Sequence, residues 1–148
     1  MKRLNDRTVQ VLHRVLDANT NRAMEGLRVC EEVARFLLEH RQLTRRLRAI
    51  RHELAMGIHR ASGSKPLMRH RDVPHDVGRL FGSRRYAPGR WQELFLANSS
   101  RVKEALRVLE EFSRLLDGVS SDRFQRIRFR FYAWEQAALA ALARLRYH

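Results

Sequence analysis

Two stretches of the chain carry the same polar residues, 79 positions apart. Residues 18–32 align with residues 97–111, and the identical polar pairs are Asn19/Asn98, Arg22/Arg101, Glu25/Glu104, Arg28/Arg107, Glu31/Glu110 and Glu32/Glu111. A duplicated core would need only matching apolar positions, because surface polar residues carry little information about a fold. Guanidinium groups bind phosphates and carboxylates bind divalent cations. The repeat therefore indicates a polar site shared by the two stretches.

The spacing within the repeat indicates how such a site would form. Asn19, Arg22, Glu25 and Arg28 step by three, so they drift slowly along one side of a helix, and their copies do the same. Two such strips facing each other would form a cleft. The alternative is a ladder of ordinary surface ion pairs, each worth about 0.2–0.5 kcal/mol. The asparagines favour the cleft, because asparagine is a poor residue for a helix interior and has no role in an ion-pair ladder.

Between the repeats lies a segment that is rich in turn-forming residues. All three prolines and four of the seven glycines fall within residues 63–89, which predicts a long central loop. Arg71, Asp72 and Asp76 lie in this loop, ahead of a glycine. Two carboxylates four residues apart beside an arginine could hold Mg²⁺ and a phosphate together, whereas the alternative is a solvated turn.

Apolar residues at helical spacing predict the elements that position these motifs. The predicted helical runs cover residues 9–38, 43–61, 94–116 and about 120–145. Asp117-Gly118 is a plausible helix stop, and Ser120, Ser121 or Asp122 could cap the last helix. No segment alternates as a strand would. We therefore expect one all-α domain over 1–148, with a first hairpin (1–62), a central loop (63–90) and a second hairpin (91–148) related by a pseudo-two-fold.

The composition indicates an anionic partner. Thirty Lys+Arg residues against 16 Asp+Glu give a formal net charge of +14, and only three of the basic residues are lysine. Nucleic acid, an acidic membrane surface or a phosphorylated small molecule would suit this charge, and a genome that favours Arg codons is the plain alternative. The carboxylates interleaved with the arginines disfavour a polyphosphate backbone and favour a metal-bound nucleotide.

Two further features bear on location and on the nucleic-acid alternative. No stretch approaches the roughly 20 apolar residues of a membrane span, and the lone Cys30, which lies on an apolar stripe, makes the cytoplasm the expected compartment. Aromatic residues alternate with arginines between 123 and 134, a pattern that could bind single-stranded nucleic acid. More often such aromatics are core residues, with arginine stems covering the edge.

Three ordered motifs resemble those of one known family. Residues 16–29, Arg71-Asp72 with Asp76-Val77-Gly78, and residues 97–111 resemble the thiamine-biosynthesis hydroxymethylpyrimidine-phosphate kinase family, a helical domain often fused N-terminal to thiamine-phosphate synthase. The match covers nearly the whole chain. The family loop commonly reads Arg-Asp-Thr-x-Gly-Asp, whereas Val73 and His75 stand here in place of Thr and Gly.

The resemblance implies an ATP- and Mg²⁺-dependent transfer of a phosphoryl group to 4-amino-5-hydroxymethyl-2-methylpyrimidine phosphate, giving the diphosphate. On this basis we expect catalytic roles for Arg22, Glu25, Arg101, Glu104 and Asp72, substrate or nucleotide binding by Asn19, Arg28, Arg71, Asn98 and Arg107, and metal binding by Glu32, Glu111 and Asp76. Which hairpin would take which substrate stays open. A homodimer, a non-catalytic association with a separate thiamine-phosphate synthase, and a nucleic-acid-binding role also remain as alternatives.

Overall fold

The computed structural model describes residues 4–63, 67–75 and 86–145, and its regular elements are all helical. The α-helices are α1 (Asp6–Glu32), α2 (Arg41–Ala61), α3 (Trp91–Ser113) and α4 (Gly118–Leu145). A π-helical turn, η1 (Val33–Leu37), extends α1, and a 3₁₀ turn, η2 (Leu67–His70), lies in the central loop. The all-α prediction is confirmed, since these described residues contain no strand.

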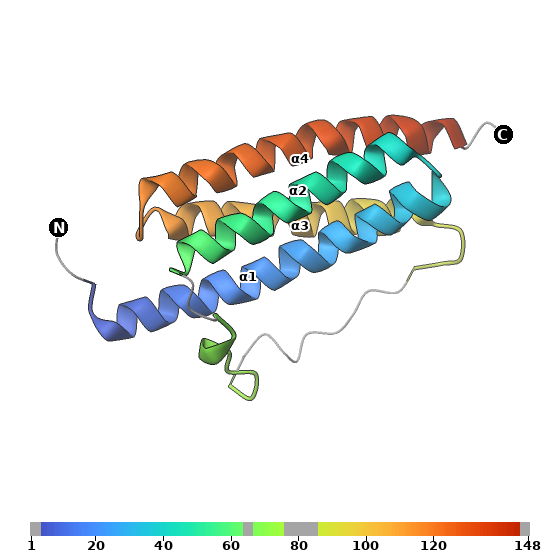
Figure 1. The fold of residues 1–148 in the computed structure, drawn as a ribbon. Helices are drawn as coiled ribbons and strands as arrows, with labels where there is room; N and C mark the ends of the chain where they lie inside the picture. The colour runs from blue at the N-terminus through green and yellow to red at the C-terminus, as the bar shows by residue number, and fades with distance from the viewer. Residues whose placement is uncertain (1–3, 64–66, 76–85, 146–148) are drawn as a thin grey trace.

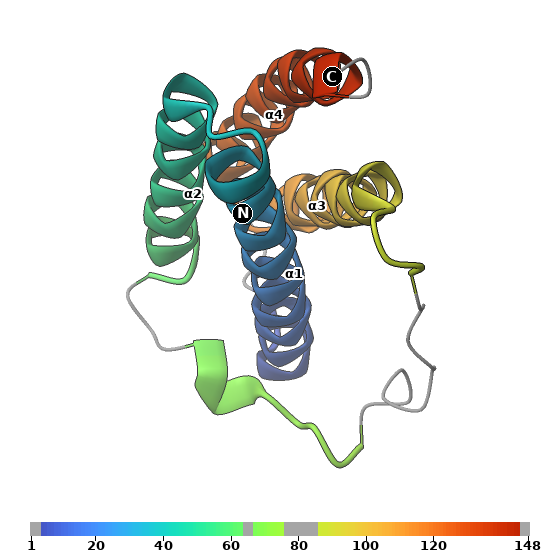
Figure 2. The same ribbon diagram turned by 90° about the vertical axis from the view of Figure 1, so that its right-hand side faces the viewer.

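The four α-helices form an elongated bundle (Figure 1). Helix α1 runs antiparallel to both α2 and α3, and α4 runs antiparallel to α3. The most extensive contacts join α1 to α3, α3 to α4 and α2 to α4. Two of these contacts, α1 with α3 and α2 with α4, join each helix of the first hairpin to its counterpart in the second, as expected for two hairpins related by a pseudo-two-fold. Figure 2, which looks along the bundle, shows the four helices around a common centre, with residues 67–75 lying outside them.

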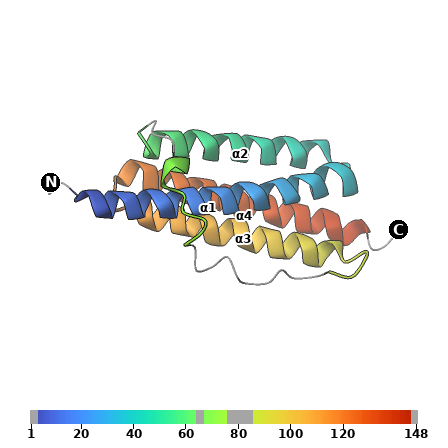
Figure 3. The ribbon, with the colours of Figure 1, turned by 90° about the horizontal axis from the view of Figure 1, so that it is seen from below.

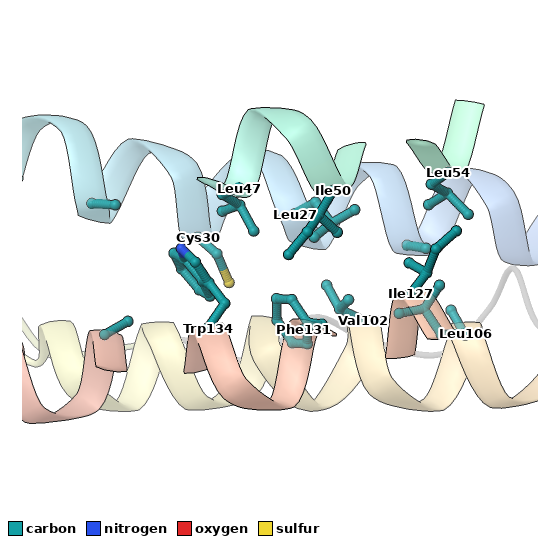
Figure 4. Packing of buried hydrophobic residues seen from close by; sticks show 14 of the residues in the cluster. Leu27, Cys30, Leu47, Ile50, Leu54, Val102, Leu106, Ile127, Phe131 and Trp134 are labelled. Atoms are coloured by element: carbon teal, nitrogen blue, oxygen red, sulfur yellow. The ribbon is translucent and has the colours of Figure 1, made fainter. Parts of the chain in front are cut away.

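Side chains from all four helices fill the core (Figure 4). Cys30 of α1, Leu47 of α2, Val102 of α3 and Trp134 of α4 are fully buried there, and the apolar spacing of three and four residues places each on its helix's inner face. The Trp134 Nε1–H donates to the Leu43 carbonyl at 2.9 Å, which satisfies its polar edge. The prediction of a buried Cys30 is confirmed.

The aromatic residues of α4 mostly serve the core. Phe124, Phe131 and Trp134 are fully buried, whereas Phe129 is exposed. The core interpretation of these aromatics is therefore confirmed for Phe124, Phe131 and Trp134.

Helices α1 and α3 approach each other closely at Gly26. A Cβ atom built on Gly26 would lie 2.7 Å from Cγ2 of Val102 and 2.9 Å from the backbone oxygen of Asn98, both on α3. Any larger residue would force the helices apart. Because the two repeats lie on these two helices, the close crossing brings their polar strips together.

The helix ends differ in detail from the sequence-based prediction. Helix α4 begins at Gly118, and the Asp117 carboxylate accepts a hydrogen bond from the Ser120 N–H at 2.6 Å. The expected cap at Ser120–Asp122 is therefore wrong, and Gly118 starts a helix rather than ending one. The reason is local: α3 already ends at Ser113, and the Asp117 carboxylate satisfies an N–H that the first turn of α4 leaves unpaired.

Candidate functional site

The equivalent arginines of the two repeats line one pocket. This central pocket, of about 390 Å³, lies between α1 and α3, and its walls include Asn19 and Arg22 from one helix and Arg101 and Glu104 from the other. Arg22, Arg101 and Glu104 are exposed, and within the described part of the chain none of the three enters an ion pair. The pocket therefore presents two guanidinium groups and a carboxylate toward any bound molecule.

A second pocket adjoins the first. This loop pocket, of about 520 Å³, lies between α1 and the segment that follows η2, which crosses α1 in Figure 3. Its lining residues are Val11, Arg14, Val15, Asp17, Ala18, Asn19, Asn21, Arg22, His70, Arg71, Asp72 and Val73. Asn19 and Arg22 belong to both pockets. The Arg22 side chain therefore borders both pockets.

Asp17 holds the loop against α1. The Arg71 Nε–H donates to Oδ2 of Asp17 at 2.8 Å, and Arg71 Nη2 donates to Oδ1 at 2.9 Å, so the pair is bidentate. This hydrogen bonding raises the pKa of Arg71 above its already high ordinary value. Sequence reasoning missed Asp17, because the burial that requires a basic partner for this residue is visible only in the structure.

The loop residues beside Arg71 are also paired. Asp72 Oδ1 lies 2.8 Å from Nδ1 of His75, and this hydrogen bond is the main reason that the pKa of Asp72 is lowered, with a smaller contribution from the charge of Arg14. Asp72 is therefore an anion at neutral pH. The rings of His13 and His70 contact each other, with Nδ1 of the first 3.3 Å from Nε2 of the second, which adds another link between α1 and η2.

The two repeated asparagines have a structural role in their own helices. The Asn19 amide donates to the Val15 carbonyl at 2.9 Å, and the Asn98 amide donates to the Leu94 carbonyl at the same distance. This bonding to the preceding turn explains how asparagine is accommodated inside both helices. The Asn19 Oδ1 also accepts a hydrogen bond from Arg22 at 3.4 Å, whereas Asn98 lines neither the central nor the loop pocket.

Several other predicted site residues lie away from the two pockets. Arg28 pairs with Glu32 at 3.2 Å and Arg107 pairs with Glu111 at 2.6 Å, so the ion-pair alternative is confirmed at these positions. None of these four side chains lines either pocket. Glu25 is exposed outside the pocket linings, and its charge acts on Arg71. The predicted metal ligand Asp76 lies outside the described residues.

The described carboxylates do not gather into a magnesium site. Over residues 4–63, 67–75 and 86–145, no three Asp, Glu, His or Cys side chains cluster closely enough to hold a metal ion. Asp17 and Asp72 are each occupied by a partner, and Glu32 and Glu111 are paired with arginines. Mg²⁺ usually binds through one or two carboxylates together with substrate phosphates. Glu104 is the pocket carboxylate left for such a role.

Comparison with known protein families gives a match over most of the chain. The model of the ThiD2 family matches residues 14–137. The chain belongs to the ThiD2 family. This assignment runs from Arg14 of α1 through most of α4, and it therefore covers both repeats and all the residues that line the two pockets except Val11.

Relatives of this ThiD2 chain include proteins named thiamine-phosphate synthase. Proteins named thiamine-phosphate synthase are 41% identical over 129 residues in Synechocystis, 39% over 121 residues in Rhodopirellula baltica and 34% over 141 residues in Gloeobacter violaceus. These alignments cover 86%, 81% and 93% of this chain but 36%, 32% and 39% of the relatives. The chain therefore spans about a third of their length. The predicted membership of a thiamine-biosynthesis family is therefore confirmed, and the kinase activity stays a prediction.

No solved structure gives a significant match to the chain. Among the described helices, none is long and apolar enough to cross a membrane.

Proposed function

We propose that this chain transfers a phosphoryl group from MgATP to 4-amino-5-hydroxymethyl-2-methylpyrimidine phosphate, giving ADP and the pyrimidine diphosphate. One observation carries the proposal: two adjoining pockets, each within the size range of small-molecule sites, share Arg22. A kinase for this acceptor must hold two phosphorylated molecules with their reacting ends together. A guanidinium group between the two molecules suits the negative charge of the transferred phosphoryl group.

The chemistry of this acceptor matches what the pockets offer. An oxygen of the pyrimidine monophosphate attacks the γ-phosphorus of ATP, the bond from that phosphorus to the bridging oxygen breaks, and ADP leaves. The attacking oxygen is already ionised at neutral pH, so no general base has to remove a proton from it. The reaction then requires mainly alignment and neutralisation of negative charge, which arginines provide.

Each pocket residue has a stated task in this proposal. Arg22 contacts the transferred phosphoryl group from between the pockets, and Arg101 contacts the phosphates from the α3 side. Glu104 is the carboxylate that would hold the Mg²⁺ supplied with the nucleotide. The Asp17–Arg71 pair positions the loop that forms one wall. These assignments rest on the pocket linings and on the pairing of Asp17.

The test is ADP release by the purified chain with MgATP and the pyrimidine monophosphate. Arg22→Ala and Arg101→Ala are expected to lower kcat/KM by about 100-fold or more, because each removes a cation from the reacting phosphates. Arg126→Ala is the matched control, since this exposed arginine on α4 lies in neither pocket lining. Helical circular dichroism should be unchanged in all three variants. Unchanged turnover in Arg22→Ala would contradict the proposal.

A second candidate rests on the relatives. Because proteins named thiamine-phosphate synthase contain a region similar to this chain, non-catalytic association with a separate synthase is the alternative. Sedimentation of the chain with a thiamine-phosphate synthase would distinguish the two. Complex formation without any ADP release would favour the alternative, and turnover by the isolated chain would favour the kinase.

A further inference from the structure

A third pocket lies at the corner where α1 turns into α2, the right-hand end of both helices in Figure 1. This corner pocket has a volume of about 430 Å³ and is lined by Arg35, Glu39, Arg41, Thr44, Arg45 and Arg48. Four arginines therefore converge on one concavity that contains a single carboxylate. The corner lies about 20 Å along α1 from Arg22, since the helix rises roughly 1.5 Å per residue, so this pocket is separate from the proposed kinase site.

The backbone of the corner adds to its positive potential. The π-helical turn η1 ends α1, and Glu39 then adopts a positive φ of 49° before α2 begins. The N-cap of α2 is His40, whose Nδ1 accepts from the Leu43 N–H at 3.3 Å, and the first turn of α2 contains no acidic residue. A helix N-terminus carries a partial positive charge. The N-terminus of α2 lies at this corner, where Arg41, Thr44 and Arg45 of its first turns line the pocket.

Two of the four arginines already have a contact within the chain, and two are available. Arg48 donates to the fully buried Glu31 at 2.8 Å, and the Arg35 guanidinium packs 4.6 Å from the Phe36 ring centre. Arg41 and Arg45 are exposed, and neither pairs with a carboxylate among the described residues. A ligand can therefore engage Arg41 and Arg45 without displacing another contact, and Arg35 and Arg48 add to the positive charge of the pocket.

The opposite corner, between α3 and α4, lacks these properties. Asp117 caps α4 there with a carboxylate, and Arg114, the repeat equivalent of Arg35, is paired with Glu110 and Glu111. An anion at that corner would meet a like charge and would have to displace existing ion pairs. The positive corner pocket is therefore a specific feature of the first hairpin and is not a general consequence of the arginine-rich composition.

We propose that the corner pocket binds a small anion bearing two or more phosphoryl groups. A single phosphate can engage one or two guanidinium groups at once, whereas four guanidinium groups around one concavity match a larger number of acceptor oxygens. A nucleic-acid backbone would be contacted by cations spread along a face of the protein. These arginines instead gather in one hollow.

The test is calorimetric titration with inorganic triphosphate, on a chain in which Arg22→Ala and Arg101→Ala have removed the guanidinium groups of the central pocket. We expect binding to persist in this background. Adding Arg41→Ala and Arg45→Ala should weaken it by about tenfold or more, because two charge-assisted contacts are lost. Adding Arg7→Ala and Arg126→Ala removes the same charge from exposed positions outside the pocket and should weaken it no more than about twofold.

A second variant keeps all the arginines. Thr44→Glu places a carboxylate in the pocket lining and should also abolish triphosphate binding, with unchanged helical circular dichroism. Equal weakening by the Arg41/Arg45 and Arg7/Arg126 pairs would overturn the proposal in favour of non-specific attraction to a chain of high positive charge. Displacement of bound triphosphate by a single-stranded oligonucleotide at equal phosphate concentration would also overturn it.

Discussion

The two repeats bury the same glutamate in different surroundings. Glu110 accepts hydrogen bonds on both oxygens, one of them from Arg128 of α4, whose side chain is only 11% exposed. Glu31 is equally buried, but its partners on α2, Arg48 and Arg51, are 53% and 28% exposed, and its Oε2, which lies 3.3 Å from Nη2 of Arg51, accepts no hydrogen bond from the described residues. The repeated segments therefore have the same sequence at this position, and the packed neighbour determines how well each carboxylate is satisfied.

A second difference decides where the site can form. Asp17 lies just before the first repeat and binds Arg71, whereas the residue at the equivalent place before the second repeat is the exposed Leu96. Only the first hairpin can therefore hold the central loop by this ion pair. The duplication places equivalent arginines on α1 and α3. The carboxylate of Asp17, which has no counterpart on α3, holds the loop that forms the second wall of the loop pocket. The predictions below test these differences.

The largest expected effect separates the two buried glutamates. Glu110→Ala should lower the free energy of unfolding by about 3–5 kcal/mol, because it leaves the nearly buried Arg128 without its partner. Glu31→Ala should cost less, about 1–2 kcal/mol, because Arg48 and Arg51 are more exposed than Arg128 and stay hydrated without the carboxylate. Urea denaturation of both variants measures the difference. Equal losses would show that the two environments are energetically equivalent.

The next effect tests the close crossing of α1 and α3. Gly26→Ala should destabilise the fold by about 1–3 kcal/mol, because the new methyl group would meet Val102 and the Asn98 backbone. Gly118→Ala is the matched control, since a Cβ there has no neighbour within 4 Å. The control should be neutral or slightly stabilising in thermal unfolding. A tolerated Gly26→Ala would mean that the helices can separate without cost.

A smaller effect concerns the loop wall. Asp17→Asn should weaken the attachment of residues 70–73 to α1, because the bidentate contact with Arg71 loses its negative charge. Hydrogen exchange at the backbone of these residues should accelerate, and kcat/KM of the proposed reaction should fall. Leu96→Asn, at the equivalent position of α3, should change neither quantity. Identical behaviour of the two variants would remove the asymmetry between the hairpins.

The smallest expected effect is at Cys30, which has leucine at the equivalent position of the second repeat. Burial, aided by the charge of Glu135, raises the pKa of the Cys30 thiol from 9.0 to about 12. The folded chain should therefore react with a thiol reagent only after unfolding. Because the unfolded thiol ionises first, this group's contribution to stability is complete below pH 9 and is lost as pH rises toward 12. Labelling in native and denaturing buffer measures the accessibility, and rapid native labelling at pH 8 would contradict it.

The spacing of apolar residues along the sequence predicted much of the fold, but it did not predict where the helices end. The positions of Leu27, Leu47 and Trp134 in the core were readable because a helix places every third or fourth residue on one face. The start of α4 was misplaced because either Asp117 or a nearby serine can cap a helix. Which of them does so depends on where the preceding helix ends, and packing decides that.

The sequence by itself determined that the chain is helical, that it is duplicated and that arginine and glutamate repeat in step, because these properties are periodic along one dimension. Only the tertiary structure decided which repeated side chains meet. Arg22 and Arg101 line one pocket because α1 and α3 cross closely at Gly26, whereas Arg28 and Arg107 are paired with glutamates of their own helices. The partnership of Asp17 with Arg71, 54 residues away, was likewise set by the path of the loop. Spacing along a helix determines the face on which a residue lies, and packing determines what that face contacts.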